Sequence, residues 1–145
     1  MNKLLPFDNV NKGKIACITG ANAGIGLASA YYFASKGYSL ILLARRKEKL
    51  EEVSQHIKSI YPVDILLITL DVKNEIEVSK LFSTLQKPWN KIDFLLNNAG
   101  NAKGFSPFQE GNLAHWEEMI DTNIKGLIYV SRAVIPLMIQ EKKGF

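Results

Sequence analysis

Short apolar runs alternate along this chain with stretches whose apolar residues recur at helical spacing. Four runs rich in Ile, Leu and Val are bounded by turn residues and cover residues 14–19, 39–44, 63–70 and 92–96. Apolar runs of this length without polar alternation are typical of strands buried on both faces, as in a parallel sheet. The pattern therefore predicts four parallel strands.

Helices are predicted between and after these runs. Two apolar stripes have the spacing of one helix face: Leu50, Val53, Ile57 and Ile60, and then Val78, Leu81, Phe82 and Leu85. Gly37 is expected to end the first helix, and Asn112 to cap the last one, whose apolar face continues past Pro136. Because proline lacks the N–H that an interior helical turn uses, Pro136 is expected to bend this helix or to end its regular part.

Strand and helix alternate in the order that predicts an α/β fold. Right-handed crossovers turn such a chain into a doubly wound parallel sheet, the three-layer α/β/α arrangement of the Rossmann type. We expect a polar leader over residues 1–13 and one α/β domain over residues 14–145. In this fold ligands bind beyond the carboxyl ends of the strands, so the residues that follow each run are the candidates for a site.

The first strand leads into Thr-Gly-Ala-Asn-Ala-Gly-Ile-Gly at residues 19–26. A bound phosphate needs backbone N–H groups at short range and the positive end of a helix dipole. Gly20, Gly24 and Gly26 lack the Cβ atoms that would hold a pyrophosphate away or block the packing of helix against strand. The motif indicates a phosphate-binding turn; the alternative is a strand-to-helix turn that is only rich in small residues.

The second strand ends at Ala44-Arg45-Arg46, without an acidic residue. A carboxylate at this point would bind the ribose hydroxyls of NAD, whereas an arginine suits a 2′-phosphate. The two arginines therefore favour NADP (NADPH in its reduced form) as the cofactor. The alternative is that both are solvated residues at the start of a helix.

Polar residues also follow the third and fourth strands. Asp71 can accept a hydrogen bond from an adenine amino group while Val72 packs on the ring, although Asp71 could equally cap the next helix. The fourth strand leads into Asn97-Asn98-Ala99-Gly100, which suits a wall beside a ribose or, in isolation, an ordinary turn. Four such motifs, one at each strand end, favour a single nucleotide site.

Together these motifs resemble those of the short-chain dehydrogenase/reductase family. The matching residues are T-G-x-x-x-G-I-G at 19–26, Asp71, N-N-A-G at 97–100 and Asn123 in the last helix, and the likeness runs from about Lys14 to the final residue. A closer similarity, to the NADP-dependent branch that oxidises 3-hydroxy acids and serine- or allo-threonine-type amino acids, is carried by ARRKEKLEE, NNAGNAKGFSP and HWEEMIDTNIKGLIYVSRAVIPLM.

The resemblance implies a role for each matching position. The pyrophosphate is expected at Gly20, Asn22, Ala23, Gly24, Ile25 and Gly26, and the 2′-phosphate at Arg45 and Arg46. Adenine is expected at Asp71 and Val72, and the adjacent ribose at Asn98, Ala99 and Gly100. Asn123 corresponds to the catalytic asparagine of the family, which holds a water in the proton relay. Without the resemblance, an asparagine on an apolar helix face would be interpreted as a packing residue with a backbone hydrogen bond.

The resemblance further implies hydride transfer between NADP(H) and a small hydroxyl or carbonyl substrate. A tyrosine would be the general acid/base, a lysine would lower the pKa of that tyrosine, and a serine would hold the substrate oxygen. In the family these residues follow the asparagine helix, so this 145-residue chain is expected to lack the catalytic half and to be inactive alone. Tyr32 and Lys36 do match Tyr-x-x-x-Lys, but they lie roughly 12–18 Å along a helix from the glycine turn and are interpreted as ordinary helix residues.

Two other classes of function stay as alternatives to an enzyme. One is a catalytically inactive, truncated dinucleotide-binding fragment. The other is a protein that binds a flavin or another mononucleotide, although such a protein would not need N-N-A-G together with Asn123. A metal centre is not expected, because His56 and His115 lie on different helices without a cluster of ligands.

Composition narrows the expected partners. The net charge is +4, but basic residues are mixed with acidic ones on short helical stretches, so nucleic acid is not an expected partner. No apolar stretch is long enough for a membrane span or a signal peptide, and the single Cys17 sits in an apolar run, which together favour a cytoplasmic protein. An apolar outer face on the last helix and an open edge on the fourth strand lead us to expect a homo-oligomer, a dimer or tetramer.

Overall fold

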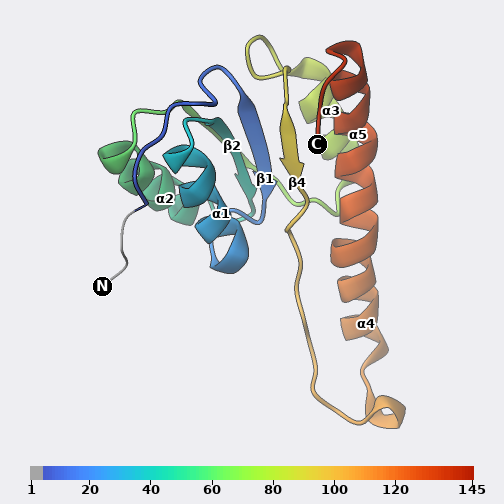
Figure 1. The fold of residues 1–145 in the computed structure, drawn as a ribbon. Helices are drawn as coiled ribbons and strands as arrows, with labels where there is room; N and C mark the ends of the chain where they lie inside the picture. The colour runs from blue at the N-terminus through green and yellow to red at the C-terminus, as the bar shows by residue number, and fades with distance from the viewer. Residues whose placement is uncertain (1–4) are drawn as a thin grey trace.

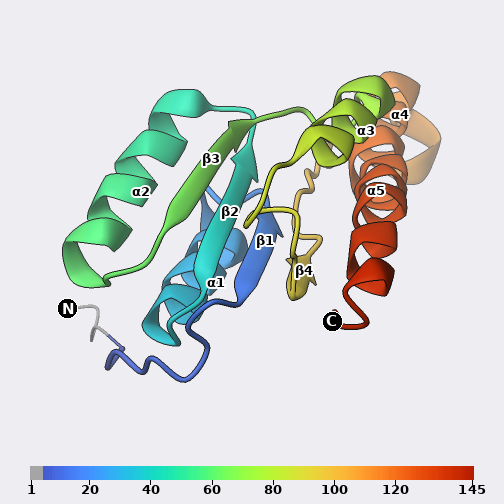
Figure 2. The same cartoon turned by 90° about the horizontal axis from the view of Figure 1, so that it is seen from above.

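The computed structural model describes residues 5–145, in which four strands form one parallel sheet. The strands are β1 (Ile15–Thr19), β2 (Ser39–Ala44), β3 (Ile65–Thr69) and β4 (Phe94–Leu96). Their order across the sheet is β3-β2-β1-β4, so the chain crosses to the far side of β1 after β3; Figure 1 shows the fold, and Figure 2 shows the four strands in this order. The predicted doubly wound sheet is confirmed, and its third and fourth strands are shorter than the apolar runs that predicted them.

Helices connect the strands and follow the last one. They are α1 (Gly24–Ser35), α2 (Lys47–Ile60), α3 (Glu75–Thr84), α4 (Leu113–Ile120) and α5 (Leu127–Gln140), with a 3-10 turn η1 (Phe108–Glu110) and a π-helical segment η2 (Asp121–Gly126). Gly37 lies just past α1 with φ +79°, and its N–H donates to the carbonyl of Ala34 at 3.0 Å. This is the left-handed helix end that the sequence predicted.

The helices cover both faces of the sheet, because successive residues of a strand point to opposite sides. Ala16 and Ile18 of β1 belong to a core shared with α1 and α2, whereas Ile15 and Cys17 belong to a core shared with α3 and α5. Figure 2 shows the two helical layers on opposite sides of the strands. The predicted three-layer arrangement is confirmed.

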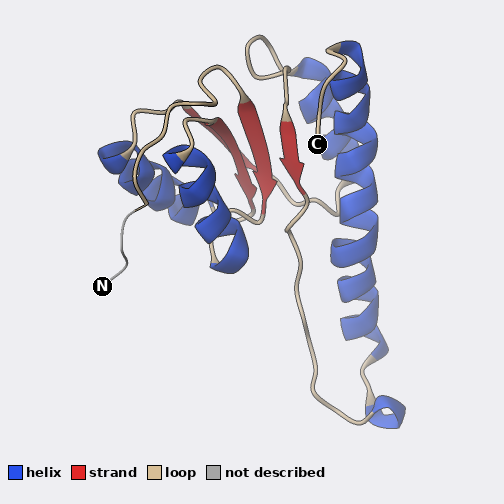
Figure 3. Ribbon diagram, in the orientation of Figure 1, coloured by secondary structure: helices blue, strands red, loops and turns tan. Residues whose placement is uncertain are grey.

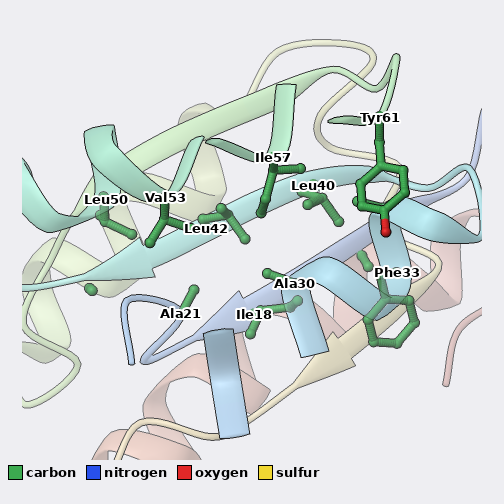
Figure 4. Packing of buried hydrophobic residues seen from close by; sticks show 13 residues of the cluster. Ile18, Ala21, Ala30, Phe33, Leu40, Leu42, Leu50, Val53, Ile57 and Tyr61 are labelled. Carbon is green, nitrogen blue, oxygen red and sulfur yellow. The ribbon is translucent and has the colours of Figure 1, made fainter. Parts of the chain in front are cut away.

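The core beneath α1 and α2 is built from residues at strand and helix spacing. Leu40 and Leu42 of β2 are fully buried and pack with the α2 stripe of Leu50, Val53 and Ile57 (Figure 4). Burial of each such side chain contributes about 1.5–3 kcal/mol. The predicted stripe is therefore the contact face of α2, with its fourth member, Ile60, half-buried at the end of the helix.

α4, η2 and α5 follow one another without a break in Figure 1. Asn112 caps α4 as predicted, since its Oδ1 accepts a hydrogen bond from the Ala114 N–H at 2.9 Å. The helix does not end at Pro136, however, but continues to Gln140. Val134 and Met138, on either side of the proline, are buried against the sheet, and their burial outweighs the roughly 3 kcal/mol that a mid-helix proline costs.

Residues 5–13 of the predicted leader pack on the end of α1. The Asp8 N–H donates to the carbonyl of Ser35 at 2.6 Å, and the Asn11 Nδ2 donates to that of Lys36 at 3.1 Å. These carbonyls have no partner within the helix, so the leader completes the hydrogen bonding of α1. Residues 1–4 of that leader lie outside the described residues, and a domain boundary at residue 14 stays a prediction.

The outer edge of β4, expected to be open, is covered at one point. The Leu95 N–H donates to the carbonyl of Phe145 at 2.8 Å, and the Phe145 N–H donates to that of Asp93 at 3.0 Å. Phe145 therefore occupies a position in the hydrogen-bond ladder beside β4. Across the part of the chain that the structure describes, no helix is both long and apolar enough to cross a membrane.

Candidate functional site

A cleft of about 770 Å³ opens at the carboxyl edge of the sheet, where the segments after all four strands meet. Every residue predicted to bind the cofactor lines it except Gly26; these are Gly20, Asn22, Ala23, Gly24, Ile25, Arg45, Arg46, Asp71, Val72, Asn98, Ala99 and Gly100. The structure adds four residues that the sequence did not single out: Leu43, Ala44, Leu70 and Thr122. Leu43 and Ala44 are the last two residues of β2, and Leu70 directly follows β3, so the strand-end rule points to all three; Thr122 had no such signal.

The glycine turn closes one side of the cleft. Gly20 has φ +66°, and a Cβ there would lie 2.9 Å from the Cα of Ala99, so a side chain would collide with the turn after β4. Gly26 faces the carbonyl of Gly20 and the amide of Asn98 rather than the cleft. Its role is thus the close packing of α1 on the sheet, not contact with a ligand.

The amino end of α1 opens into the same turn. Its N-cap residue is Ala23, whose side chain has no atom that can accept a hydrogen bond. The first N–H groups of the helix are therefore not capped by their own turn. Ala23, Gly24 and Ile25 all line the cleft, so these donors and the positive end of the helix dipole are available to an anion there.

Thr19 and Asn98 hold the turns after β1 and β4 together. The Thr19 Oγ1 accepts hydrogen bonds from the N–H groups of Asn98 and Ala99, both at 2.9 Å. The Asn98 Nδ2 donates to the carbonyls of Thr19 and Gly20 at 3.0 and 3.3 Å. The Asn98 amide thus braces the glycine turn, while its backbone and its neighbours line the cleft. Thr19 is a structural residue of the site that the sequence showed only as the start of a motif.

Arg45 and Arg46 lie at the point where β2 passes into α2, and both are exposed. Within residues 5–145, neither guanidinium forms an ion pair with a carboxylate. Exposure alone would also suit a solvated helix start. Their place in the lining of the cleft, beside the glycine turn, favours an anionic ligand.

Asp71 and Val72 form the part of the cleft after β3. The Asp71 carboxylate accepts a hydrogen bond from the Lys73 N–H at 3.1 Å, and α3 is capped instead by Asn74, whose Oδ1 accepts from the Glu77 N–H at 3.2 Å. The alternative that Asp71 caps the next helix is therefore wrong. Asp71 retains acceptor capacity at the wall of the cleft.

Asn123 lies in η2 and does not line the cleft, although its neighbour Thr122 does. Its side chain makes two hydrogen bonds to the backbone of Asn101: Oδ1 accepts from N–H at 2.8 Å, and Nδ2 donates to the carbonyl at 2.9 Å. The residue thus fastens the loop after Gly100 to the helix. The π-helical segment itself has no signature in the sequence.

Several residues that the sequence analysis set aside lie outside this cleft. Lys36 of the Tyr-x-x-x-Lys match forms an ion pair with Asp8 at 3.8 Å, at the far end of α1. His56 forms a hydrogen bond with the hydroxyl of Tyr31 between α2 and α1. Cys17 is fully buried in β1, and burial raises the pKa of its thiol, so it stays protonated.

The strand order, the glycine turn and the position of the cleft define a Rossmann-type α/β protein. The chain belongs to the short chain dehydrogenase family, whose model matches residues 14–145.

Its relatives include the NADP-dependent 3-hydroxy acid dehydrogenase YdfG of Escherichia coli (strain K12), which is 37% identical over 130 residues, 90% of this chain and 51% of that protein. Sulfoacetaldehyde reductase 2 of Chromohalobacter salexigens is 42% identical over 130 residues, with the same shares covered, 90% and 51%. The chain thus spans about half the length of the curated relatives it matches.

Solved structures show the same likeness. The closed form of a serine dehydrogenase complexed with NADP+ superposes with a TM-score of 0.80 at 38% identity and covers 90% of this chain and 51% of its own. NAD+-bound xylitol dehydrogenase superposes with a TM-score of 0.88 at 31% identity and covers 93% and 52%. Solved relatives with either dinucleotide therefore share this fold.

Proposed function

We propose that this chain is the NADP(H)-binding portion of an oxidoreductase that transfers a hydride between the cofactor and a small hydroxyl or carbonyl substrate. The observation that carries the proposal is the pair Arg45 and Arg46, exposed in the lining of the cleft at the end of β2. No acidic residue stands at that strand end to bind the ribose hydroxyls of NAD.

The residues of the cleft fit this cofactor in order along the sheet edge. Gly20 leaves room for close approach of the backbone, and the uncapped end of α1 at Ala23 supplies donors for a pyrophosphate. The two arginines would pair with the 2′-phosphate by charge-assisted hydrogen bonds. Asp71 and Val72 would hold the adenine, and the wall of residues 98–100 the adjacent ribose. When bound, the cofactor accepts or supplies the hydride.

The substrate class follows from the named relatives. Dehydrogenases of 3-hydroxy acids and of serine share more than a third of their residues with this chain over the matched region. We therefore propose a 3-hydroxy acid or a hydroxy amino acid as the substrate of the whole protein. Asn123, held by the backbone of Asn101, would take the place of the family's catalytic asparagine beside the proton relay.

A second proposal is a chain that binds the dinucleotide without catalysing hydride transfer. It is supported by Lys36, because the lysine of the Tyr-x-x-x-Lys match pairs with Asp8 at the opposite end of α1 from the cleft. This second proposal can be tested by assaying the 145-residue chain for NADP-linked oxidation of hydroxy acids. Turnover would contradict this second proposal.

Titration calorimetry of the chain with NADPH and NADH tests the cofactor assignment directly. We expect saturable binding of NADPH and an affinity for NADH lower by about tenfold or more, because charge-assisted hydrogen bonds to a phosphate contribute about 1.5–3 kcal/mol. Equal affinities would contradict the role of the arginines while leaving the dinucleotide site in place.

A further inference from the structure

One acidic side chain fastens the loop after β4 to α4. The two carboxylate oxygens of Glu118 have different partners: Oε1 accepts a hydrogen bond from the Asn101 Nδ2 at 3.3 Å, and Oε2 forms an ion pair with the Lys103 Nζ. Both partners belong to the long loop that runs beside α4 in Figure 3. A single carboxylate therefore ties two points of this loop to the helix.

The fastened stretch continues the wall of the cleft. Asn98, Ala99 and Gly100 line the cleft, and Asn101 is the next residue. The Lys103 N–H also lies 3.3 Å from the sulfur of Met119 on α4. Gly104 follows with φ +76°, and the side chain of the next residue, Phe105, is fully exposed. The contacts of Glu118 thus lie one and three residues past the lining residues 98–100.

The charges around Glu118 keep it ionised. The hydrogen bond from Lys103 lowers the pKa of the Glu118 carboxyl, burial opposes this more weakly, and the positive charges of Lys73 and Arg45 lower it further. Coulomb interactions are mutual, so the carboxylate also makes the potential at Arg45 less positive. Taken only as a charge, Glu118 would oppose an anionic cofactor.

We propose that Glu118 is a positioning residue for the cofactor cleft, because it tethers Asn101 and Lys103 and so adds to the contacts of Thr19 and Asn123 that hold the wall of residues 98–100 in its binding shape. The inference rests on the proposed function. Without the tether, Thr19 still holds Asn98 and Ala99, and Asn123 still holds the Asn101 backbone, but the stretch up to Lys103 has fewer anchors. Part of it then has to be ordered when the cofactor binds, and that ordering subtracts from the affinity.

Three variants separate the two contacts. Glu118→Gln keeps an acceptor for Asn101 but removes the ion pair, Glu118→Ala removes both contacts, and Lys103→Met removes only the ion pair. In calorimetry with NADPH and NADH, we expect Glu118→Gln and Lys103→Met to weaken both cofactors by about threefold to tenfold, and Glu118→Ala to weaken them more. Glu117→Gln, an exposed neighbour with the same change of charge, is the matched control and should bind as the wild type does.

The direction in which Glu118→Gln changes the cofactor affinity distinguishes a tether from a purely electrostatic effect of the Glu118 charge. Loss of a negative charge beside an anionic ligand tightens binding when only the field matters, so tighter or unchanged binding would overturn the proposal. A lower melting temperature without weaker binding would overturn it as well, because it would assign Glu118 to stability alone.

Amide hydrogen exchange of residues 98–103 provides a readout without cofactor. Faster exchange of this segment in Glu118→Gln than in Glu117→Gln is expected, and equal exchange would count against the tether. Failure of the wild-type chain to bind NADPH would refute the proposed function, whereas the exchange comparison would still decide on the tether.

Discussion

Thr19 and Asn98 are joined by two hydrogen bonds across the ends of β1 and β4: the Asn98 N–H donates to the Thr19 Oγ1 at 2.9 Å, and the Asn98 Nδ2 donates to the Thr19 carbonyl at 3.0 Å. Thr19 is 1% exposed. This contact links the turns that follow the neighbouring strands β1 and β4, and so it holds two walls of the cleft together.

Thr19→Val preserves the shape of the side chain but removes the hydroxyl. The N–H groups of Asn98 and Ala99 then lose their acceptor, and a buried donor without a partner costs about 1–3 kcal/mol. We expect the free energy of unfolding in urea to fall by about 2 kcal/mol or more. The control is Thr84→Val, which removes a hydroxyl on the exposed end of α3; an equally large loss there would show that the brace is unimportant.

Gly20→Ala tests the close approach of the two turns. The substitution forces an L residue to φ +66° and places its Cβ 2.9 Å from the Cα of Ala99, so we expect a loss of stability of about 1–3 kcal/mol or more. Gly13→Ala carries a similar backbone cost at φ +85° but has open space around its Cβ. The melting temperature of Gly20→Ala should be lower than that of Gly13→Ala, because only the first substitution adds a steric collision. Equal melting temperatures would show that the turn can move aside.

Arg45→Glu tests the charge that would recognise a 2′-phosphate. It replaces a cation with an anion, and we expect NADPH affinity measured by calorimetry to fall by about tenfold to a hundredfold, with a much smaller change for NADH. Arg132→Glu provides the same change of charge on α5, where the residue pairs with Glu75 outside the cleft lining. A parallel loss for both cofactors would assign Arg45 to general attraction rather than to the phosphate.

The exposed apolar row on η2 and α5 predicts self-association. Ile124, Ile128 and Ile139 are 54%, 51% and 69% exposed, and a second copy of the chain would remove them from water. Sedimentation velocity should show a concentration-dependent oligomer, and Ile124→Glu should shift it toward the monomer. Ile76→Glu, at a residue 79% exposed on α3, is the control. A monomer at all concentrations would contradict the prediction.

The tether at Glu118 should weaken in acid. The pKa of this carboxyl is lowered in the folded chain, chiefly by the hydrogen bond from Lys103 and further by Lys73 and Arg45. A lowered pKa stabilises the fold above the unfolded value of about 4.3, and this stabilisation is lost as the pH falls through the folded value. The difference in melting temperature between wild type and Glu118→Gln should therefore be steady above about pH 4.3 and shrink as the pH falls through the lowered pKa of Glu118. A difference that grows in acid would contradict the assignment.

The residues at the strand ends could be predicted because a parallel sheet brings all its carboxyl ends to one edge. Arg45, Asp71 and Asn98 needed only that rule and the apolar runs before them. The continuation of α5 through Pro136 could not be predicted, since local propensity opposes it and tertiary burial of Val134 and Met138 decides.

The contacts of the loop after β4 also escaped prediction. Lys103 and Glu118 are 15 residues apart, and the irregular loop between them has no period that would bring them together. The π-helical turn around Asn123 depends on close packing as well: a Cβ on Gly126 would lie 2.6 Å from the Val72 Cγ2. Both features arise from the fitting of one element to another, which a linear pattern does not record.

The cleft is built from buried residues with structural roles and exposed residues that can contact a ligand. Thr19 and Gly26 are buried; Thr19 joins the turns after β1 and β4, and Gly26 allows α1 to pack closely on them, whereas Arg45 and Arg46 are exposed. The exposed arginines can therefore be substituted without disturbing the buried residues. Under the proposed function, coenzyme preference in this scaffold would therefore be a surface property that substitutions at Arg45 and Arg46 alter while the buried turns stay intact.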